Sequence, residues 1–476
     1  MSESTMATIT GPLTGAVPMA PGNFALADLG YVEEEYLLSG TATSYAVVGE
    51  RRSDGQWDAA PHEQAPFTTR MVVRRPSAPG AFNGTVLVEW LNVSGGGDGS
   101  PEWSFLHRQI IRDGMAWVGV SAQEVGIEGG GFVEGPNLKQ VDPVRYGTLS
   151  HPGDAYSYDL FSQAGRAVAS VLGPLSAERL VAVGESQSAG FLVTYVNGID
   201  PAVEVFDGFV IHGRGAAGAS LKGSQMRRPP DGEPFDLDKL RAAARQQTPE
   251  RIRTDVRVPV MTIQSETDTN NMGDNEARQA DDERVRLWEI AGTAHGDAYL
   301  VLAAPFDDGS LTPERFAELL TPSREVLGAV SDEPINAGPH QHYVAQAALH
   351  HLDRWLRDGT PPPEAPRLAL QLEGGYQLDS QGNAIGGIRT PWVDAPTAVL
   401  SGLGGVGGGW ASLFGRTAPF DDTTLASLYP GGKPDYMTKV RGALEESVRA
   451  GFLLESDRPE VEALLAAGYP ERTASG

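Results

Sequence analysis

Short apolar runs alternate along the chain with longer stretches that have helical periodicity. Six runs read as buried strands: TVLVEWL (85–91), MAWVGVS (115–121), RLVAVG (179–184), FDGFVIH (206–212), VPVMTIQ (258–264) and VRLWEIAG (285–292). Before the third run, residues 156–172 place apolar side chains at three- and four-residue spacings on one face, which predicts a helix. Strands that alternate with helices in this way are typical of an α/β protein with a mostly parallel sheet.

Two segments do not fit this rhythm, residues 213–256 and the C-terminal residues 366–476. Residues 43–50 and 66–76 read as leading antiparallel strands. Residues 213–256 lie between two predicted strands and are too long for a simple crossover, so we expect a lid insertion there. The pattern therefore predicts one α/β domain over residues 1–365 and a C-terminal extension over residues 366–476 that packs on it.

The segment VAVGESQSAG (181–190) holds two overlapping versions of a nucleophile elbow, a strand, sharp turn and helix with a serine at the turn. In one version the serine is Ser186, flanked by the small residues Gly184 and Ser188. In the other it is Ser188, which would extend a buried strand through Glu185 and Ser186. The pattern favours Ser186 because the apolar strand ends at Gly184. The alternative is a polar turn with an N-capping serine and no chemistry.

Partners for a serine nucleophile follow in the chain order Ser, acid, His, each after a strand. SETDT follows the run 258–264 and offers Asp268, with Glu266 as the alternative acid. TAHGD follows the run 285–292 and offers His295, with His212 as the rival histidine. A serine hydroxyl attacks only when a base takes its proton, and a carboxylate orients that base. We therefore expect Ser186, His295 and Asp268 to form a catalytic triad.

An oxyanion hole needs two main-chain N–H donors near the nucleophile. Gln187 follows Ser186 and would supply one, and the loop NVSGGGDGS would supply the other from its turn at Asn92 to Gly96, with Asn92 as the candidate. This glycine-rich loop has no G-x-G-x-x-G pattern and no lysine, so it does not indicate a nucleotide site.

The amino-acid composition limits the classes of partner that the chain can bind. A net charge of −25 disfavours nucleic acid and anionic membranes, because phosphate binding needs a basic surface. The chain has no cysteine, so thiolate metal sites and a cysteine nucleophile are excluded. The N-terminus lacks the features of a secretory signal, and no apolar run is long enough to span a membrane. We expect a cytoplasmic protein with no metal, no cofactor and a small-molecule ester as its partner; the oligomeric state stays open.

The segments FNGTVLVEWLNVSGG, GESQSAG, QSETDT, RLWEIAGTAHGD, GPHQHYVAQAALHHLDRWLRDGTPPP and GGIRTPWVDAPTAVLSG together resemble the large bacterial family of alpha/beta hydrolase domain proteins, over nearly the whole chain. The resemblance implies an α/β-hydrolase fold, with a mostly parallel eight-stranded sheet flanked by helices, and a triad of Ser186, an acid in ETD and His295. It makes residues 1–365 the catalytic domain. The expected function is a serine esterase that forms an acyl-enzyme. Amidase or lactonase activity, or a catalytically silent binding protein of the same fold, are the alternatives.

Overall fold

The sheet has nine strands in the order β1-β2-β3-β5-β4-β6-β7-β8-β9. The computed structural model describes residues 7–19, 21–223, 247–372, 374–405 and 409–470. The strands are β1 (Thr8–Thr10), β2 (Tyr31–Val48), β3 (Asp58–Pro76), β4 (Thr85–Trp90), β5 (Ala116–Val120), β6 (Arg179–Glu185), β7 (Gly208–His212), β8 (Val260–Gln264) and β9 (Val285–Glu289). All pairings from β5 through β4 to β9 are parallel, and those among β1, β2, β3 and β5 are antiparallel.

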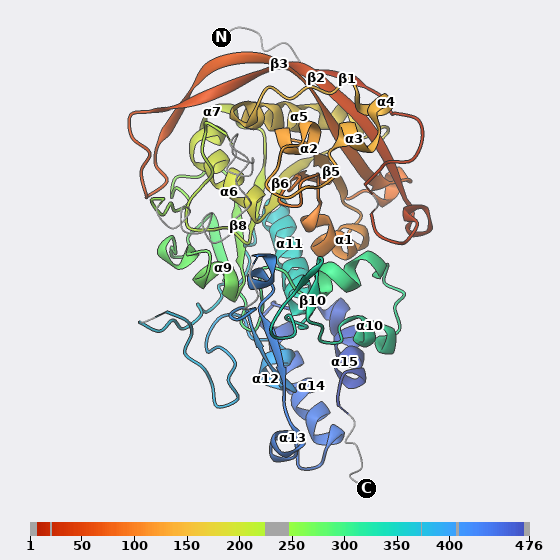
Figure 1. Ribbon diagram of the computed structural model, residues 1–476, viewed down its shortest axis with the longest axis vertical. Helices are drawn as coiled ribbons and strands as arrows, with labels where there is room; N and C mark the ends of the chain where they lie inside the picture. The colour runs from red at the N-terminus through yellow and green to blue at the C-terminus, as the bar shows by residue number, and fades with distance from the viewer. Residues whose placement is uncertain (1–6, 20, 224–246, 373, 406–408, 471–476) are drawn as a thin grey trace.

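The predicted fold class is confirmed, and the predicted number of eight strands is too low by one. The six apolar runs form β4 to β9, with each boundary within three residues of the prediction. The leading strands are far longer than 43–50 and 66–76, because β2 and β3 form one long hairpin that arches over an end of the molecule (Figure 1). The short strand β1 pairs along the free edge of β2, which gives the ninth strand.

Helices cover both faces of the sheet, and the alternation of side chains along each strand explains why. In β6, Val181 and Val183 belong to one hydrophobic cluster, while Ala182 belongs to the other. Helices α1 (Pro101–Arg112) and α11 (His340–Asp358) pack on the first face, and α5 (Ser157–Val171) and α6 (Gln187–Thr194) pack on the second. The helix predicted over 156–172 is α5. The other α-helices in the described residues of the α/β domain are α2 (Glu124–Glu128), α3 (Leu138–Val141), α4 (Pro143–Tyr146), α7 (Asp200–Val203), α9 (Glu266–Asn270) and α10 (Pro313–Leu319).

The C-terminal residues shown in blue lie at the opposite end of the molecule from the β2–β3 hairpin (Figure 1). They contain the two-stranded sheet of β12 (Ala398–Ser401) and β13 (Arg416–Pro419), together with α12 (Pro391–Asp394), α13 (Asp422–Leu428), α14 (Lys433–Arg449) and α15 (Arg458–Ala467). Val440 and Leu464 of this part share a core cluster with Tyr343 and Leu349 of α11. The division of the chain at residue 365 stays a prediction.

Much of the predicted lid insertion, residues 224–246, lies outside the described residues. The described flanks, 213–223 and 247–256, contain no helix or strand. Of the helices in the described ranges, none is both long enough and apolar enough to cross a bilayer.

Candidate active site

Ser186 stands at the sharp turn between β6 and α6. Its backbone has φ 61° and ψ −118°, a strained conformation that an ordinary residue rarely adopts. Gly184 makes the turn possible, since a Cβ at that position would lie 3.1 Å from the Cβ of Ser188 and 3.1 Å from Cδ1 of Leu192. Ser186 lines a cavity, whereas Ser188 is fully buried in α6. The structure therefore places the turn at Ser186; β6 extends one residue beyond the predicted end, through Glu185.

Asp268 lies in the first turn of α9, directly after β8, and His295 lies in the loop that follows β9; both meet Ser186 at the carboxyl end of the sheet. His295 Nε2 lies 2.8 Å from Ser186 Oγ, and His295 Nδ1 lies 2.6 Å from Asp268 Oδ1. The other carboxylate oxygen of Asp268 accepts hydrogen bonds of 2.7 Å from both the N–H and the hydroxyl of Ser265. Although burial alone would raise the pKa of Asp268, the charge and hydrogen bonds of His295 and Ser265 hold it below its usual value. The three predicted residues therefore form a continuous hydrogen-bonded chain that ends in an ionised carboxylate.

Glu266, the alternative acid, lies two residues from Asp268 but makes different contacts. Its carboxylate accepts hydrogen bonds from the main-chain N–H groups of Gly292 (2.6 Å) and Gly402 (2.8 Å) and from the hydroxyl of Ser401 (3.1 Å). Burial raises the pKa of Glu266 to about 7 in spite of these donors. Glu266 therefore ties the loop after β9 to the C-terminal extension, while Asp268 contacts His295.

Glu185 is a further acidic residue at the site, and sequence reasoning missed it as a functional residue. Its Oε1 lies 3.2 Å from His295 Nε2, the same nitrogen that faces Ser186. Its side chain is 7% exposed. Its position in the sequence was the signal that could have found it. An acidic residue directly before the candidate nucleophile lies at the C-terminal end of a central strand, next to the site.

The two predicted oxyanion donors differ in availability. The main-chain N–H of Gln187 is in the first turn of α6, where amides have no partner within the helix. The main-chain N–H of Asn92, however, donates to Gly99 O at 2.9 Å, so the prediction of this group as a donor is wrong. The pairing of Asn92 with Gly99 closes the glycine-rich loop. In the same turn, the amides of Val93 and Gly95 have no hydrogen bond within the described residues, and they become the candidates for the second donor.

The cavity at Ser186 has a volume of about 530 Å³ and is mostly apolar. The α/β domain and the C-terminal extension both line it, the latter through Trp410, Leu413 and Phe414. Two hydrogen bonds join these parts beside the site, from Gly296 N–H to Leu413 O (3.1 Å) and from Asn336 N–H to Phe414 O (2.8 Å). No local pattern in the sequence indicates this wall, because its residues lie more than a hundred positions after β9, the last strand of the large sheet.

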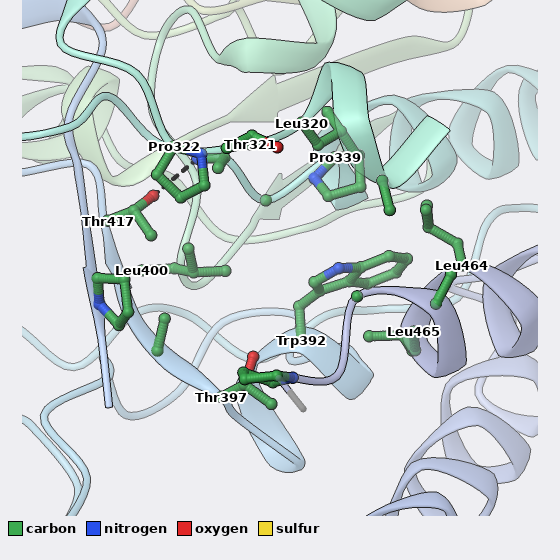
Figure 2. A pocket seen from close by; sticks show the side chains of 18 of the residues that line it. Leu320, Thr321, Pro322, Pro339, Trp392, Thr397, Leu400, Thr417, Leu464 and Leu465 are labelled. Carbon is green, nitrogen blue, oxygen red and sulfur yellow. Dashed lines mark hydrogen bonds between the residues drawn. The ribbon is translucent and has the colours of Figure 1, made fainter. Parts of the chain in front are cut away.

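A second cavity, of about 580 Å³, lies between α10, α12, the β12–β13 sheet and α15 (Figure 2). Trp392 is at its centre, and Leu464 and Leu465 flank it on one side (Figure 2). Among the described residues that line it, none is a serine or a histidine. This cavity therefore lacks the nucleophile and base that the first one has. Within the described ranges, no group of three or more His, Asp or Glu residues could hold a metal ion.

Four of the other histidines lie in helices or strands. His107 is in α1, and His350 and His351 are in α11. His212 ends β7 at the same edge of the sheet as His295, and its Nδ1 lies 3.4 Å from Glu102 Oε1 rather than against a serine.

A known protein family matches this chain over most of its length. A family model described as "Alpha/beta hydrolase domain" matches residues 5–463. A search of curated proteins found no match. Among solved structures, the serine hydrolase XC6422 from Xanthomonas campestris is 12% identical with a TM-score of 0.29 and covers 53% of this chain and 86% of its own. Esterase Est22 is 12% identical with a TM-score of 0.32, and the match covers 58% of this chain and 76% of Est22. The Pyrococcus furiosus esterase Pf2001 is 10% identical with a TM-score of 0.28, and the match covers 57% of this chain and 85% of Pf2001. Similarity at these TM-scores says nothing about the chemistry of this chain.

Proposed function

Since the chain belongs to the alpha/beta hydrolase domain family, we propose that it is a serine hydrolase that cleaves carboxylic esters through an acyl-enzyme. The observation that carries the proposal is the hydrogen-bonded chain from Ser186 Oγ through His295 to Asp268, with distances of 2.8 and 2.6 Å, at the wall of a cavity. No cofactor takes part in this chemistry.

In the first half of the reaction, Ser186 attacks the ester carbonyl while His295 Nε2 takes the hydroxyl proton. Asp268 holds the ring through Nδ1–H and stabilises the imidazolium that forms. The negative oxygen of the tetrahedral intermediate accepts hydrogen bonds from the N–H of Gln187 and from an amide of the Asn92 loop, Val93 or Gly95. His295 then donates its proton to the leaving alcohol. Water repeats these steps on the acyl-enzyme and releases the acid.

The lining of the cavity supports a neutral substrate with an apolar group. Trp410, Leu413 and Phe414 form an apolar wall, whereas the charged or ionisable residues that line the cavity are Asp98, Glu185 and His295. A substrate with a free carboxylate would meet acidic side chains there, without a lysine or arginine among the described lining residues. Simple esters with an aliphatic or aromatic acyl group are therefore the first compounds to test. Amides and lactones use the same triad and remain the alternatives within the enzyme class.

The test compares Ser186→Ala with Ser188→Ala, a matched change two residues away. We expect the wild type and Ser188→Ala to hydrolyse p-nitrophenyl butyrate and to react with a fluorophosphonate probe. Ser186→Ala should do neither. Labelling that survives in Ser186→Ala and disappears in Ser188→Ala would assign the nucleophile to Ser188. A folded wild type that neither reacts with the probe nor turns over any ester, while apolar ligands raise its melting temperature, would favour the silent binding protein.

A further inference from the structure

Besides the nucleophile, a carboxylate oxygen lies close to His295 Nε2. Ser186 Oγ lies 2.8 Å away, and Glu185 Oε1 lies 3.2 Å away. Because Nδ1 faces Asp268 at 2.6 Å, the ring is held between carboxyl groups on both of its nitrogens. The triad mechanism as proposed makes no use of the second carboxyl group.

The fold brings Glu185 to this place through strand geometry. Side chains alternate along β6, so Glu185 lies on the same face of the sheet as Val181 and Val183, which is the face covered by α1 and α11. Its partner in the register of β7 is His212. Gly213 follows with φ 63°, and a Cβ there would lie 3.1 Å from His295 Nδ1 and 3.5 Å from Glu185 Oε1. The absence of a side chain at Gly213 therefore lets Glu185 and His295 approach each other.

Glu185 is buried, and both histidines and other acidic residues act on its carboxyl group. After burial, the largest effects on it come from His295, His212 of β7, Glu102 of α1 and Asp268. Burial raises the pKa of Glu185 to about 7, against the opposing effect of the two histidines. Glu102 in turn lies 3.4 Å from His212 Nδ1. A positive charge that appears on His295 is therefore the strongest stabilising partner available to an ionised Glu185.

We propose that Glu185 is a positioning residue of the site, whose carboxylate accepts a hydrogen bond from Nε2–H of protonated His295 and holds the ring between Ser186 and the leaving group. This inference rests on the proposed function. The proton moves from Ser186 to His295 and then to the leaving-group oxygen, and Glu185 takes no net proton in the cycle. Its contribution is to stabilise the imidazolium and to limit rotation of the ring while both tetrahedral steps take place.

The test is the protonation of His295, followed by NMR of protein labelled with ¹⁵N-histidine, because this measurement needs no turnover. The signal of His295 is assigned by its loss in His295→Gln. In Glu185→Gln, which keeps the size of the side chain, we expect the titration midpoint of His295 to fall by about one pH unit. The matched control is Glu102→Gln, which removes a carboxylate of the same buried group but leaves the contact between Glu185 and His295; its effect on His295 should be well under half as large.

Kinetics with p-nitrophenyl butyrate give a second readout. In Glu185→Gln, the acidic limb of the pH profile of kcat/KM should move to lower pH together with the His295 midpoint, kcat on the plateau should fall about tenfold, and KM should stay within about twofold. Glu185→Asp, which restores a carboxylate, should regain part of the midpoint shift.

Ser186→Ala provides a second test that does not depend on whether Glu185→Gln folds. It leaves Glu185 in place, so Nε2–H of protonated His295 should still give a slowly exchanging downfield proton signal. An unchanged His295 midpoint in folded Glu185→Gln, or a rapidly exchanging Nε2–H in Ser186→Ala, would overturn the proposal. A wild type without esterase activity whose His295 midpoint still depends on Glu185 would refute the proposed function and leave this contact standing.

Discussion

Glu266 and Asp268 are only two residues apart, and we expect them to respond in opposite ways to substitution. Asp268→Asn should lower kcat/KM by about 10³–10⁴-fold, because the amide cannot hold Nδ1–H of His295 and favours the wrong tautomer. The variant keeps the size of the side chain, and Ser265 can still donate to the amide oxygen, so the free energy of unfolding should change by no more than about 1 kcal/mol.

Glu266→Ala should instead lower the free energy of unfolding. Three donors lose their acceptor: the N–H groups of Gly292 and Gly402, both of which belong to buried residues, and the hydroxyl of Ser401. Each buried donor left unpaired costs about 1–3 kcal/mol, so the free energy of unfolding should fall by about 3 kcal/mol even if Ser401 turns to solvent. Folded Glu266→Ala should retain esterase activity within about tenfold, because Asp268 still contacts His295.

Urea unfolding followed by tryptophan fluorescence, together with hydrolysis of p-nitrophenyl butyrate, separates the two effects. Both variants are measured at the same temperature and pH, well below the unfolding transition. If Glu266→Ala lost more than 10³-fold in kcat/KM with unchanged stability, while Asp268→Asn stayed active, Glu266 would be the triad acid and the assignment from the 2.6 Å contact would be refuted.

Three more predictions concern the turn, the cavity and pH. Gly184→Ala should lower the free energy of unfolding by about 1–3 kcal/mol, since its Cβ would lie 3.1 Å from two side chains; a stable variant with normal probe labelling would show that the turn can relax. Phe414→Ala should enlarge the cavity and raise the kcat/KM ratio of p-nitrophenyl octanoate to acetate; an unchanged ratio would mean that the acyl group binds elsewhere. The raised pKa of Glu185, about 7 against an ordinary 4.5, means that the folded state binds a proton which the unfolded chain releases, so stability should fall as pH rises from about 4.5 to 7. Glu185→Gln should show a smaller fall in urea titrations, and an identical pH dependence would contradict a buried Glu185.

The sequence by itself determined the parts of this protein that depend on neighbouring residues. The parallel strands β4 to β9 appeared as apolar runs because both faces of such a sheet are buried. Gly184 and Ser188 marked the turn at Ser186, because only small side chains fit where a strand and a helix cross at close range. The order of Ser186, Asp268 and His295 also followed from local position, since each comes directly after a parallel strand and such strands end at one edge of the sheet.

The tertiary structure decided what depends on contacts between distant segments. It distinguished the role of Asp268 from that of Glu266. The carboxylate of Glu266 accepts hydrogen bonds from donors that include Gly402, 136 residues away along the chain. It brought Phe414 to the cavity, and it engaged the N–H of Asn92 with Gly99, which no spacing rule could anticipate. Local patterns fix the direction and ends of strands, but pairing between buried polar groups depends on which surfaces meet when the chain folds. For that reason the position of Ser186 could be predicted from ten residues, whereas the environment of His295 required the whole fold.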